Sequence, residues 1–551
     1  MASLGAFAGY AAISFVYFGL PLMPHPGRDL IGNGQQLDPE IFTWSFAWWP
    51  HALTSWTNPL FTHAIYAPQG INLTWTTSVP VLAYVFWPVT AAFGPAVAFN
   101  VAAIVLPALA AWTAFLLCRH LTGSVWASLV GGYLFGFSSY ILGHQLAGHL
   151  NLTAVFLLPL AALAVIRFVQ GELGGRGLAV RLGLLLALQL GISTEVALTL
   201  TVVLALCLAL AGVFVREWRP RLRASVVPLL GAYAIGGALA SPLLIYALRG
   251  FVPSDLDPYH FSSDLFNLVI PTRTIAFGGP LLKSVSNSFL GNDDERGSYL
   301  GLPAILIVFL WSRKRWGIPA SRFLTVALVA TAILAIGTGL RVFGYRLIPF
   351  PWAVAARLPL IDGVLPQRFA VYVSLACAVI VALWISSTAG RRASRPVLLP
   401  VLAVAALVPA LWHHEYRQHP SRPSFFASGA YRTCVPRGSR LLLFPFGRWG
   451  DSMLWQAESG FWFSMAEGDM GRDHLPKSFV ADPVAERLTL QFVIPGHPQP
   501  PPSIPALEAF AQSHGVERIV TVDGQTYPTA EQLTQRGTER LDDVTVSPRC
   551  T

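Results

Sequence analysis

The strongest constraint on this chain is a succession of long apolar runs separated by short charged turns. An α-helix rises 1.5 Å per residue, so about 20 apolar residues cross a hydrocarbon core of roughly 30 Å. Only 12% of the residues are charged, which is about half the share of an ordinary soluble domain. These features exclude a soluble fold, a disordered chain and a collagen-like chain, and they predict a polytopic α-helical membrane protein.

The sequence predicts eleven membrane spans. The first is Leu4–Met23, which lacks the basic start and the small-residue cleavage site of a signal peptide. We therefore expect it to remain as an uncleaved helix. The other spans are expected near residues 96–118, 124–143, 150–168, 178–194, 196–215, 224–248, 298–312, 320–340, 369–389 and 396–413.

Arginine and lysine side chains indicate how these spans are oriented. If the spans alternate, the short turns on one side hold fifteen of these residues, and the positive-inside rule makes that side cytoplasmic. This topology accounts for the net charge of +9 without a dense basic segment, so we expect no nucleic-acid partner. We predict a multi-pass protein of the bacterial cytoplasmic membrane, with its N-terminus inside and its C-terminal region outside.

Two stretches depart from the simple pattern of spans. Residues 79–93 are apolar but short and contain Pro80 and Pro88. A full span there would reverse every later charge assignment, so we expect a re-entrant or interfacial segment on the outer side. The run from Leu182 to Val215 is too long for one span, at about 51 Å by the helical rise. We expect it to break at Ser193-Thr194-Glu195.

The chain divides into two predicted domains. Residues 1–413 form the transmembrane domain, whose first outer loop, 24–95, is long. Residues 414–551 form a small external α/β domain, because a strand pattern, LLLFPF, precedes a helix-then-strand pattern, IPALEAFAQSHGVERIVTVDG. Cys434 and Cys550 share this domain, so the sequence leaves a disulfide and two free thiols equally open.

Carboxylates gather on the predicted outer side, and the most informative segment is GQQLDPEIFTWSFAWWPHAL, residues 34–53. Aromatic residues at this density favour the membrane–water interface, so an interfacial helix would fix Asp38 and Glu40 beside the lipid headgroups. Such carboxylates suit catalysis or substrate binding. Helix capping is the alternative, because Asp38 before Pro39 is a good N-cap, and both roles are compatible.

This segment and five others resemble the GT-C superfamily of integral-membrane glycosyltransferases, in particular bacterial YfhO-like members. The other segments are NPLFTHAIYAPQGINLTW, GHQLAGHLN, SDLFNLVIPT, RGSYLGLPA and LPQRFAVYVSLA. The resemblance covers residues 1–413 and extends only loosely to the C-terminal region. It implies a GT-C-like fold, a polyprenyl-phosphate-linked sugar donor, and a glycan, lipid or protein acceptor.

The resemblance also implies that an acidic residue of the first outer loop is the general base. Pro39 separates Asp38 from Glu40, whereas the better-known members carry an adjacent Asp-Glu pair. Both residues therefore remain candidates, and we favour Asp38. Transfer from a lipid phosphate needs a base for the acceptor hydroxyl and cations for the phosphate. By analogy with inverting glycosidases, attack opposite the leaving group inverts the anomeric carbon.

Several outer-side residues are candidates for binding the substrate or a metal ion. Arginine suits a lipid phosphate at the membrane boundary, although a salt-bridged or snorkelling arginine is the commoner case. Glu195 is costly in a membrane, and its alternative role is to cap the next helix. His144 and His149, and the acidic run Asp293-Asp294-Glu295, leave a divalent cation open without requiring a cofactor. The substrate-binding candidates are Arg273, Lys283, Arg296, Arg357, Arg368, His149 and Glu195.

Two other functions compete with sugar transfer. A polyprenyl-lipid or glycolipid transporter or flippase predicts internal repeats and charges at the bilayer midplane. The sequence shows no internal repeat, and its carboxylates gather on one side instead of at the midplane. A non-catalytic scaffold gives no reason for long, carboxylate-rich outer loops.

Overall fold

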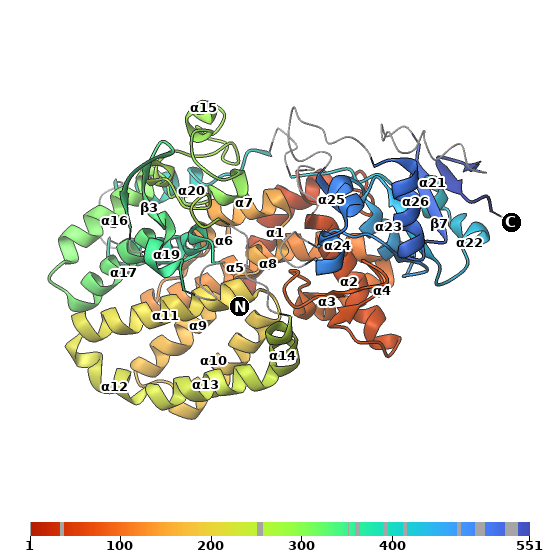
Figure 1. Cartoon of the computed structure of the whole chain (residues 1–551). Helices are drawn as coiled ribbons and strands as arrows, with labels where there is room; N and C mark the ends of the chain where they lie inside the picture. Colours follow the sequence, from red (N-terminus) through yellow and green to blue (C-terminus); the bar gives the residue numbers. More distant parts are fainter. Residues whose placement is uncertain are drawn as a thin grey trace.

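The computed structural model describes residues 2–33, 38–250, 257–350, 352–358, 364–388, 395–411, 416–470, 475–490, 502–523 and 538–550. The predicted domain boundary at 413 and residues 34–37 of the first-loop segment lie outside these ranges. The described chain forms a helical membrane domain and a smaller mixed domain, in blue in Figure 1, that lies against the first-loop helices.

The membrane domain is built from helices of very different length (Figure 1). Short 3-10 and π turns extend several of them. The helices are α1 (Ala2–Ser14), α5 (Pro95–Thr122), α6 (Val125–Gly136), α7 (Ser139–Ala147), α8 (Leu150–Thr153), α9 (Leu157–Val169), α10 (Gly175–Leu190), α11 (Thr194–Phe214), α12 (Arg219–Ala224), α13 (Val226–Leu239), α14 (Ser241–Arg249), α15 (Lys283–Ser286), α16 (Leu302–Arg315), α17 (Pro319–Ile336), α18 (Trp352–Ala355), α19 (Ala370–Thr388) and α20 (Arg395–Ala405).

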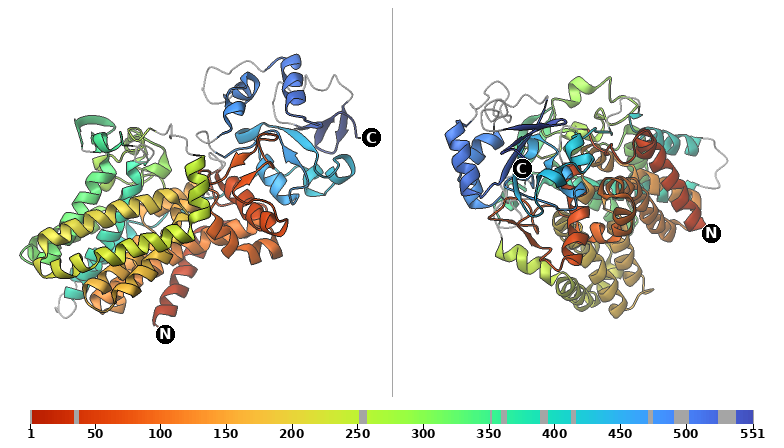
Figure 2. Two further views of the ribbon diagram at one scale, coloured as in Figure 1. Left: turned by 60° about the horizontal axis from the view of Figure 1, so that its bottom comes forward. Right: turned by 90° about the vertical axis from the view of Figure 1, so that its right-hand side faces the viewer.

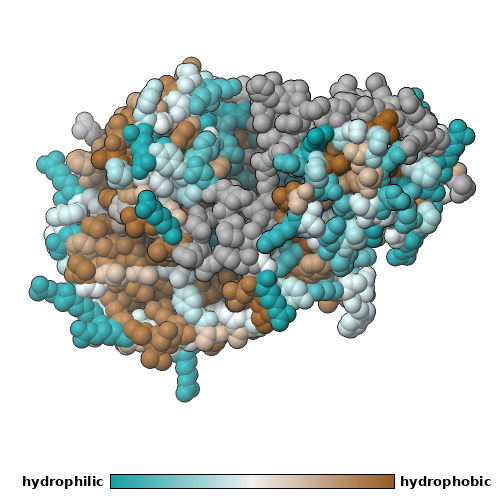
Figure 3. Space-filling view, in the orientation of Figure 1, coloured by the Kyte–Doolittle hydropathy of each residue, from teal (hydrophilic) through white to brown (hydrophobic). Residues whose placement is uncertain are grey.

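Seven described helices are long and apolar enough to cross a membrane, or eight if a pair bent by 45° at residue 225 counts as one span. They coincide with predicted spans, which makes this a multi-pass membrane protein. Three predicted spans correspond to shorter helices: α10 has 16 residues, α16 has 14 and α20 has 11. The count of eleven thus remains a prediction. Figure 3 shows the brown, apolar surface that these helices present.

The two irregular stretches are interrupted in the structure, as expected, while the re-entrant or interfacial placement of the first remains a prediction. Residues 79–93 form two helices, α3 (Pro80–Val85) and α4 (Trp87–Phe93), which are too short to cross a membrane. The long apolar run breaks between α10 and α11. Ser193 caps α11 there, because its hydroxyl accepts a hydrogen bond of 3.3 Å from the backbone N–H of Val196.

The first-loop helix α2 (Asp38–Thr54) forms where the sequence predicts an interfacial helix. Its aromatic residues are buried in protein: Trp44 and Phe46 are fully covered, and Trp49 is 3% exposed. The C-terminal domain supplies an aromatic partner, Phe461, to Trp44 at 5.5 Å, while Phe86 and Tyr84 of the first loop pack against Phe46 and Trp49. The helix therefore lies between the two domains, and its aromatic density reflects packing on several sides.

The C-terminal domain contains the α/β unit expected from the sequence. Its sheet has the order β6-β5-β7-β9-β8, with β5 parallel to both β6 and β7. The strands are β5 (Arg440–Phe444), β6 (Ser464–Met465), β7 (Arg518–Val522), β8 (Glu539–Leu541) and β9 (Val544–Ser547). The helices are α21 (Ser424–Ala427), α22 (Tyr431–Cys434), α23 (Ser452–Glu458), α24 (Lys477–Val480), α25 (Pro483–Leu490) and α26 (Ile504–Ser513). A disulfide joins Cys434 to Cys550, which decides the alternative that the sequence left open.

The first outer loop is hydrogen-bonded to the edge of this sheet. Its short hairpin pairs β1 (Phe61–Thr62) with β2 (Ile71–Asn72). Between these strands, Ala64 accepts a hydrogen bond of 2.8 Å from Met465, and Ala67 donates one of 2.9 Å to Met465. Figure 2 shows the resulting contact of the orange first-loop segment with the blue domain. The loop thus covers an edge that would otherwise be open.

Candidate active site

Polar side chains from five distant segments meet at the predicted outer end of the membrane helices. Each comes from a helix end or a tight turn, where the chain leaves the apolar region. We call this group the carboxylate–histidine cluster. It comprises Asp38 at the start of α2, His144 of α7, His149 between α7 and α8, Glu195 of α11, Asp294 and Glu295 of a 3-10 turn, and Arg368 before α19.

Asp38 and His149 form the centre of the cluster. The Nε2 atom of His149 lies 2.9 Å from Oδ2 of Asp38, and its Nδ1 atom lies 3.2 Å from Nδ1 of His144. Burial alone would lower the pKa of His149, but the carboxylates of Asp38, Asp294 and Glu295 outweigh it and raise the pKa to about 9. The Asp38 side chain is 32% exposed, so the carboxylate is open to an incoming molecule.

Arg368 is held by two carboxylates. Its Nε donates a hydrogen bond of 3.0 Å to Glu195, and its Nη1 donates to both oxygens of Glu295 at 2.6 and 2.5 Å. Glu195 also accepts from the backbone N–H of Leu365 at 3.3 Å. The Arg368 side chain is only 8% exposed. These ion pairs indicate that Arg368 fixes α11, the acidic turn and α19 relative to one another.

A second ion-paired group surrounds Asp293. This carboxylate accepts a hydrogen bond from Nε of Arg273 and lies 3.3 Å from Nη1 of Arg296. Arg296 also donates to the carbonyl of Phe289 at 2.7 Å. The arginines suggested as phosphate ligands, Arg273, Arg296 and Arg368, are all next to the site, and each already has a carboxylate partner.

The structure separates the other candidates from the cluster. Glu40 is only 2% exposed and faces the C-terminal domain instead of Asp38. Burial, followed by the neighbouring carboxylates Asp451 and Asp469, raises its pKa well above the usual range. Arg357 is exposed in the turn after α18, and Lys283 begins the short outer helix α15. Among the described residues, neither forms an ion pair with the cluster.

The cluster and its neighbours carry excess negative charge. Five carboxylates, those of Asp38, Glu195, Asp293, Asp294 and Glu295, face three arginines, which leaves two negative charges before the histidines are counted. One potential ligand atom each from His144, His149 and Asp294 lies within 4.8 Å of the others. Imidazole with carboxylate suits Mn²⁺ or Zn²⁺, so these three residues could hold a divalent cation.

If a cation binds there, Asp38 has a second role. A metal-bound histidine usually donates its other ring N–H to a carboxylate, which orients the ring. Asp38 is placed for this, because it lies against Nε2 of His149 while the Nδ1 atom faces Asp294 at 3.7 Å. The same carboxylate can therefore accept a proton from a substrate or orient His149.

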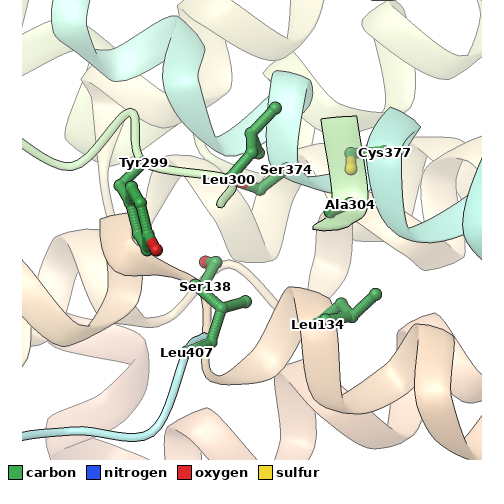
Figure 4. A pocket seen from close by; sticks show the side chains of 8 residues that line it. All are labelled: Leu134, Ser138, Tyr299, Leu300, Ala304, Ser374, Cys377 and Leu407. Carbon is green, nitrogen blue, oxygen red and sulfur yellow. The ribbon is translucent and has the colours of Figure 1, made fainter. Parts of the chain in front are cut away.

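A small cavity lies in the membrane domain at the junction of α6, α7, α16 and α19 (Figure 4). Its volume is about 10 Å³, far below that of a typical ligand pocket and close to the space of one water molecule. The hydroxyls of Ser138 and Ser374 are buried there without a hydrogen-bond partner, which suits an ordered water. Its lining residues are Leu134, Ser138, Tyr299, Leu300, Ala304, Ser374, Cys377 and Leu407.

Comparison with known proteins decides the family. Residues 6–408 match the family described as Domain of unknown function (DUF6311). The chain belongs to this family. A comparison with curated protein sequences finds no match. The DUF6311 match spans almost the whole membrane domain, and so includes every residue of the carboxylate–histidine cluster.

Solved structures identify the fold. The cryo-EM structure of the arabinofuranosyltransferase AftD from Mycobacteria is similar with a TM-score of 0.55 at 17% identity, over 94% of this chain and 35% of that chain. This DUF6311 chain thus spans about a third of the length of AftD. AftD has the GT-C fold, and the similarity shows that the DUF6311 protein shares it.

Two further structures align over most of the chain. AglB from Archaeoglobus fulgidus, an archaeal oligosaccharyltransferase solved with an inhibitory peptide and a dolichol-phosphate, has a TM-score of 0.48 at 13% identity, over 94% of this chain and 69% of that chain. ArnT from Cupriavidus metallidurans, solved bound to undecaprenyl phosphate, has a TM-score of 0.47 at 12% identity, over 98% of this chain and 97% of that chain.

Proposed function

We propose that this protein is a glycosyltransferase that moves a sugar from a polyprenyl-phosphate donor to an acceptor at the extracytoplasmic membrane face. The observation that carries the proposal is the position of Asp38: a partly exposed carboxylate of the first outer loop, fixed beside His149 where the membrane helices end. The GT-C fold and the sequence resemblance to membrane glycosyltransferases support the same function. The proposed location is the bacterial cytoplasmic membrane, with the N-terminus inside and the C-terminal domain outside.

In the proposed reaction, Asp38 takes the proton from the acceptor hydroxyl. The acceptor oxygen attacks the anomeric carbon of the donor sugar, and the bond between that carbon and the phosphate oxygen breaks. Polyprenyl phosphate leaves with the bonding electron pair, so it needs little help from a general acid. Attack from the face opposite the phosphate inverts the anomeric carbon. Asp38 is the favoured base over Glu40, because Glu40 is buried against the C-terminal domain.

The cations near the cluster would stabilise the phosphate. Arg296, Arg273 and Arg368 lie at the ends of membrane helices or in adjoining turns, at the depth where a lipid phosphate is expected. They are bonded to carboxylates, so phosphate binding requires them to share or exchange partners. A divalent cation at His144, His149 and Asp294 would supply additional positive charge when bound. Arg357 has no carboxylate partner among the described residues, and its proposed role is limited to the approach of the lipid.

A transfer assay tests this function. Purified protein in liposomes receives a panel of radiolabelled polyprenyl-phosphate sugars, with water as the default acceptor and candidate glycans, lipids and peptides added. Asp38→Asn is compared with Glu40→Gln and with Glu172→Gln, a control at an exposed pair with Arg167. We expect Asp38→Asn to abolish sugar release, while both other variants retain it.

Other outcomes would change the proposal in defined ways. Loss of transfer only in Glu40→Gln would move the base to that residue. Labelled lipid that crosses the bilayer without any sugar release would replace the glycosyltransferase by a polyprenyl-lipid or glycolipid flippase.

A further inference from the structure

A pair of arginines on the outer hairpin lies over one tyrosine ring. The hairpin consists of β3 (Gly339–Val342) and β4 (Tyr345–Pro349). The guanidinium carbon of Arg341 lies 4.3 Å from the centre of the Tyr259 ring, and that of Arg346 lies 4.8 Å from it. Arg346 also donates a hydrogen bond of 3.0 Å to the Tyr259 hydroxyl. Two positive charges are therefore held within a few ångströms of one ring.

These two arginines differ from those of the cluster in having no carboxylate partner. Within the part of the chain that the structure describes, no carboxylate oxygen lies within 4.0 Å of either guanidinium. Asp257 acts on Arg341 only from a longer distance. Arg341 is 2% exposed, and its Nε has no hydrogen-bond partner. Neighbouring like charges repel, and an unpaired buried donor is costly, so the arrangement favours an anion.

The hairpin carries apolar side chains beside these charges. Tyr345 is 77% exposed, Leu347 is 62% exposed and Ile348 is 53% exposed. β3 begins three residues after the end of α17, which is one of the helices able to cross a membrane. Exposed apolar and tyrosine side chains next to arginines, at the end of a membrane helix, are typical of a surface that meets lipid headgroups.

The same loop also reaches the carboxylate–histidine cluster. The carbonyl of Phe261, two residues after Tyr259, accepts a hydrogen bond of 3.2 Å from the backbone N–H of Gln367. Gln367 precedes Arg368. Figure 1 places β3 on the side of the membrane domain away from the C-terminal domain. A ligand at the arginine pair would therefore approach the cluster from the membrane, on the side that the C-terminal domain leaves open.

We propose that Arg341, Arg346 and Tyr259 form a binding site for the phosphate group of a membrane lipid. The exposed Arg346 can present a fork of N–H donors to phosphate oxygens, and the Tyr259 hydroxyl can donate its own proton. The buried Arg341, whose Nη2 donates to the carbonyl of Tyr259 at 2.6 Å, adds its positive charge close by. The phosphate neutralises the paired charges, while the lipid chains lie against the exposed apolar side chains of β4, of which Ile348 shares the face of Arg346. The ligand is defined by its phosphate, which either the polyprenyl-phosphate donor or an anionic phospholipid supplies. The site does not depend on sugar transfer.

Lipid binding to the full-length protein in detergent tests this site. Native mass spectrometry measures the affinity for three probes: undecaprenyl phosphate, phosphatidylglycerol, and diacylglycerol as the lipid without phosphate. The variants are Arg346→Gln, Arg346→Lys, and Arg341→Gln with Arg346→Gln. The control is Arg432→Gln, which removes a guanidinium that also lies over aromatic rings, 5.6 Å from both Tyr431 and Trp462, in the C-terminal domain.

We expect Arg346→Gln to weaken binding of at least one phosphate lipid about tenfold, and the double variant to weaken it further. Arg346→Lys should recover part of the affinity, because it keeps the charge but loses the fork. Diacylglycerol binding and the control variant should be unchanged.

The affected probe identifies the source of the phosphate. Loss for undecaprenyl phosphate alone indicates the donor, and loss for phosphatidylglycerol alone indicates a headgroup of the surrounding bilayer. Unchanged affinity for both in Arg346→Gln, which alters a partly exposed residue and should fold, would overturn the proposal. So would equal losses for diacylglycerol. Because no outcome requires turnover, the lipid site can fail while the transfer assay succeeds, and the reverse also holds.

Discussion

Asp38 and Glu40 stand two residues apart at the start of α2, yet they belong to different environments. Asp38 faces the membrane domain, where it meets His149 at 2.9 Å and remains 32% exposed. Glu40 faces the C-terminal domain, where it is 2% exposed among other carboxylates. Neighbouring positions on a helix point about 100° apart, so two residues of separation carry the side chains to nearly opposite sides.

The difference shows how one short helix serves two purposes. On one side, α2 presents a charged group that is held by a histidine and remains accessible, as chemistry requires. On the other, it presents residues to the C-terminal domain, which holds the helix in place. Gln456 of α23 illustrates this: it is fully buried, accepts a hydrogen bond of 2.7 Å from the Trp44 indole and donates one of 2.7 Å to the carbonyl of Ala64.

The largest expected effect separates the two carboxylates by activity. Asp38→Asn should lower the transfer rate about 10²- to 10⁴-fold, because the acceptor loses its base, while the thermal unfolding temperature changes little. Glu40→Gln should leave the rate within a few-fold of wild type. Rates come from initial velocities with the best donor, and thermal unfolding from intrinsic fluorescence. A large loss of transfer rate in Glu40→Gln at unchanged stability would contradict the assignment of different roles to the two carboxylates.

The next effect concerns the ion pairs that hold the cluster. Arg368→Gln leaves Glu195 and Glu295 without their buried partner, which should destabilise the membrane domain by about 3–5 kcal/mol. Removing Glu295 as well, in Arg368→Gln with Glu295→Gln, should restore part of that stability. Thermal unfolding in the same detergent measures both variants. If Arg368→Gln alone is as stable as wild type, Arg368 does not hold α11, the acidic turn and α19 together.

A smaller effect is expected at the contact between α2 and the C-terminal domain. Gln456→Ala leaves the buried Trp44 indole N–H unpaired, at a cost of about 1–3 kcal/mol, and removes one of the two donors to the Ala64 carbonyl, which keeps its hydrogen bond from Met465. We expect faster proteolysis at the domain junction and a lower transfer rate at unchanged substrate affinity. Gln456→Glu keeps the hydrogen-bond acceptor for Trp44 but loses the donor to Ala64. Its proteolysis and transfer rates should fall between those of wild type and Gln456→Ala. Proteolysis at the wild-type rate in Gln456→Ala would mean that other contacts hold the domains.

The smallest effect is a pH dependence of stability that arises in the C-terminal domain. Burial raises the pKa of Glu467 to about 8, from an ordinary value of 4.5. The folded state therefore binds more protons than the unfolded state between pH 4.5 and 8, and stability should fall as pH rises through that window, by at most about 1.4 kcal/mol per unit. Glu467→Gln should flatten the curve of unfolding temperature against pH. An unchanged slope would mean that the pH dependence arises from another group, such as Glu40.

Much of this architecture could be predicted from patterns along the chain. Long apolar runs identified the membrane helices, Ser193 marked the break before α11, and the LLLFPF pattern became β5. The shorter helices α10, α16 and α20 were harder to judge, because an apolar run records which residues avoid water and leaves open where the helix begins and ends.

The candidate site was predictable in its residues but not in their pairings. Asp38, His149, Glu195 and Arg368 each stood out as a polar group next to an apolar run. Nothing in the sequence indicated that Arg368 would bind Glu195 and Glu295, which are 173 and 73 residues away. The pairing of Tyr259 with Arg341 and Arg346 was missed, because a tyrosine and two separate arginines in outer loops have no distinguishing local pattern.

The sequence by itself determined that this chain lies in a membrane and where along the chain its long membrane helices occur, and it predicts that the acidic groups gather on one side. These properties depend on local composition and period, because each apolar residue leaves water whichever neighbours it meets. Only the tertiary structure decided that Asp38 meets His149 while Glu40 meets the C-terminal domain, and that the tryptophans of α2 are buried in protein. Those outcomes depend on which distant segments pack together, and so on contacts that no stretch of sequence contains.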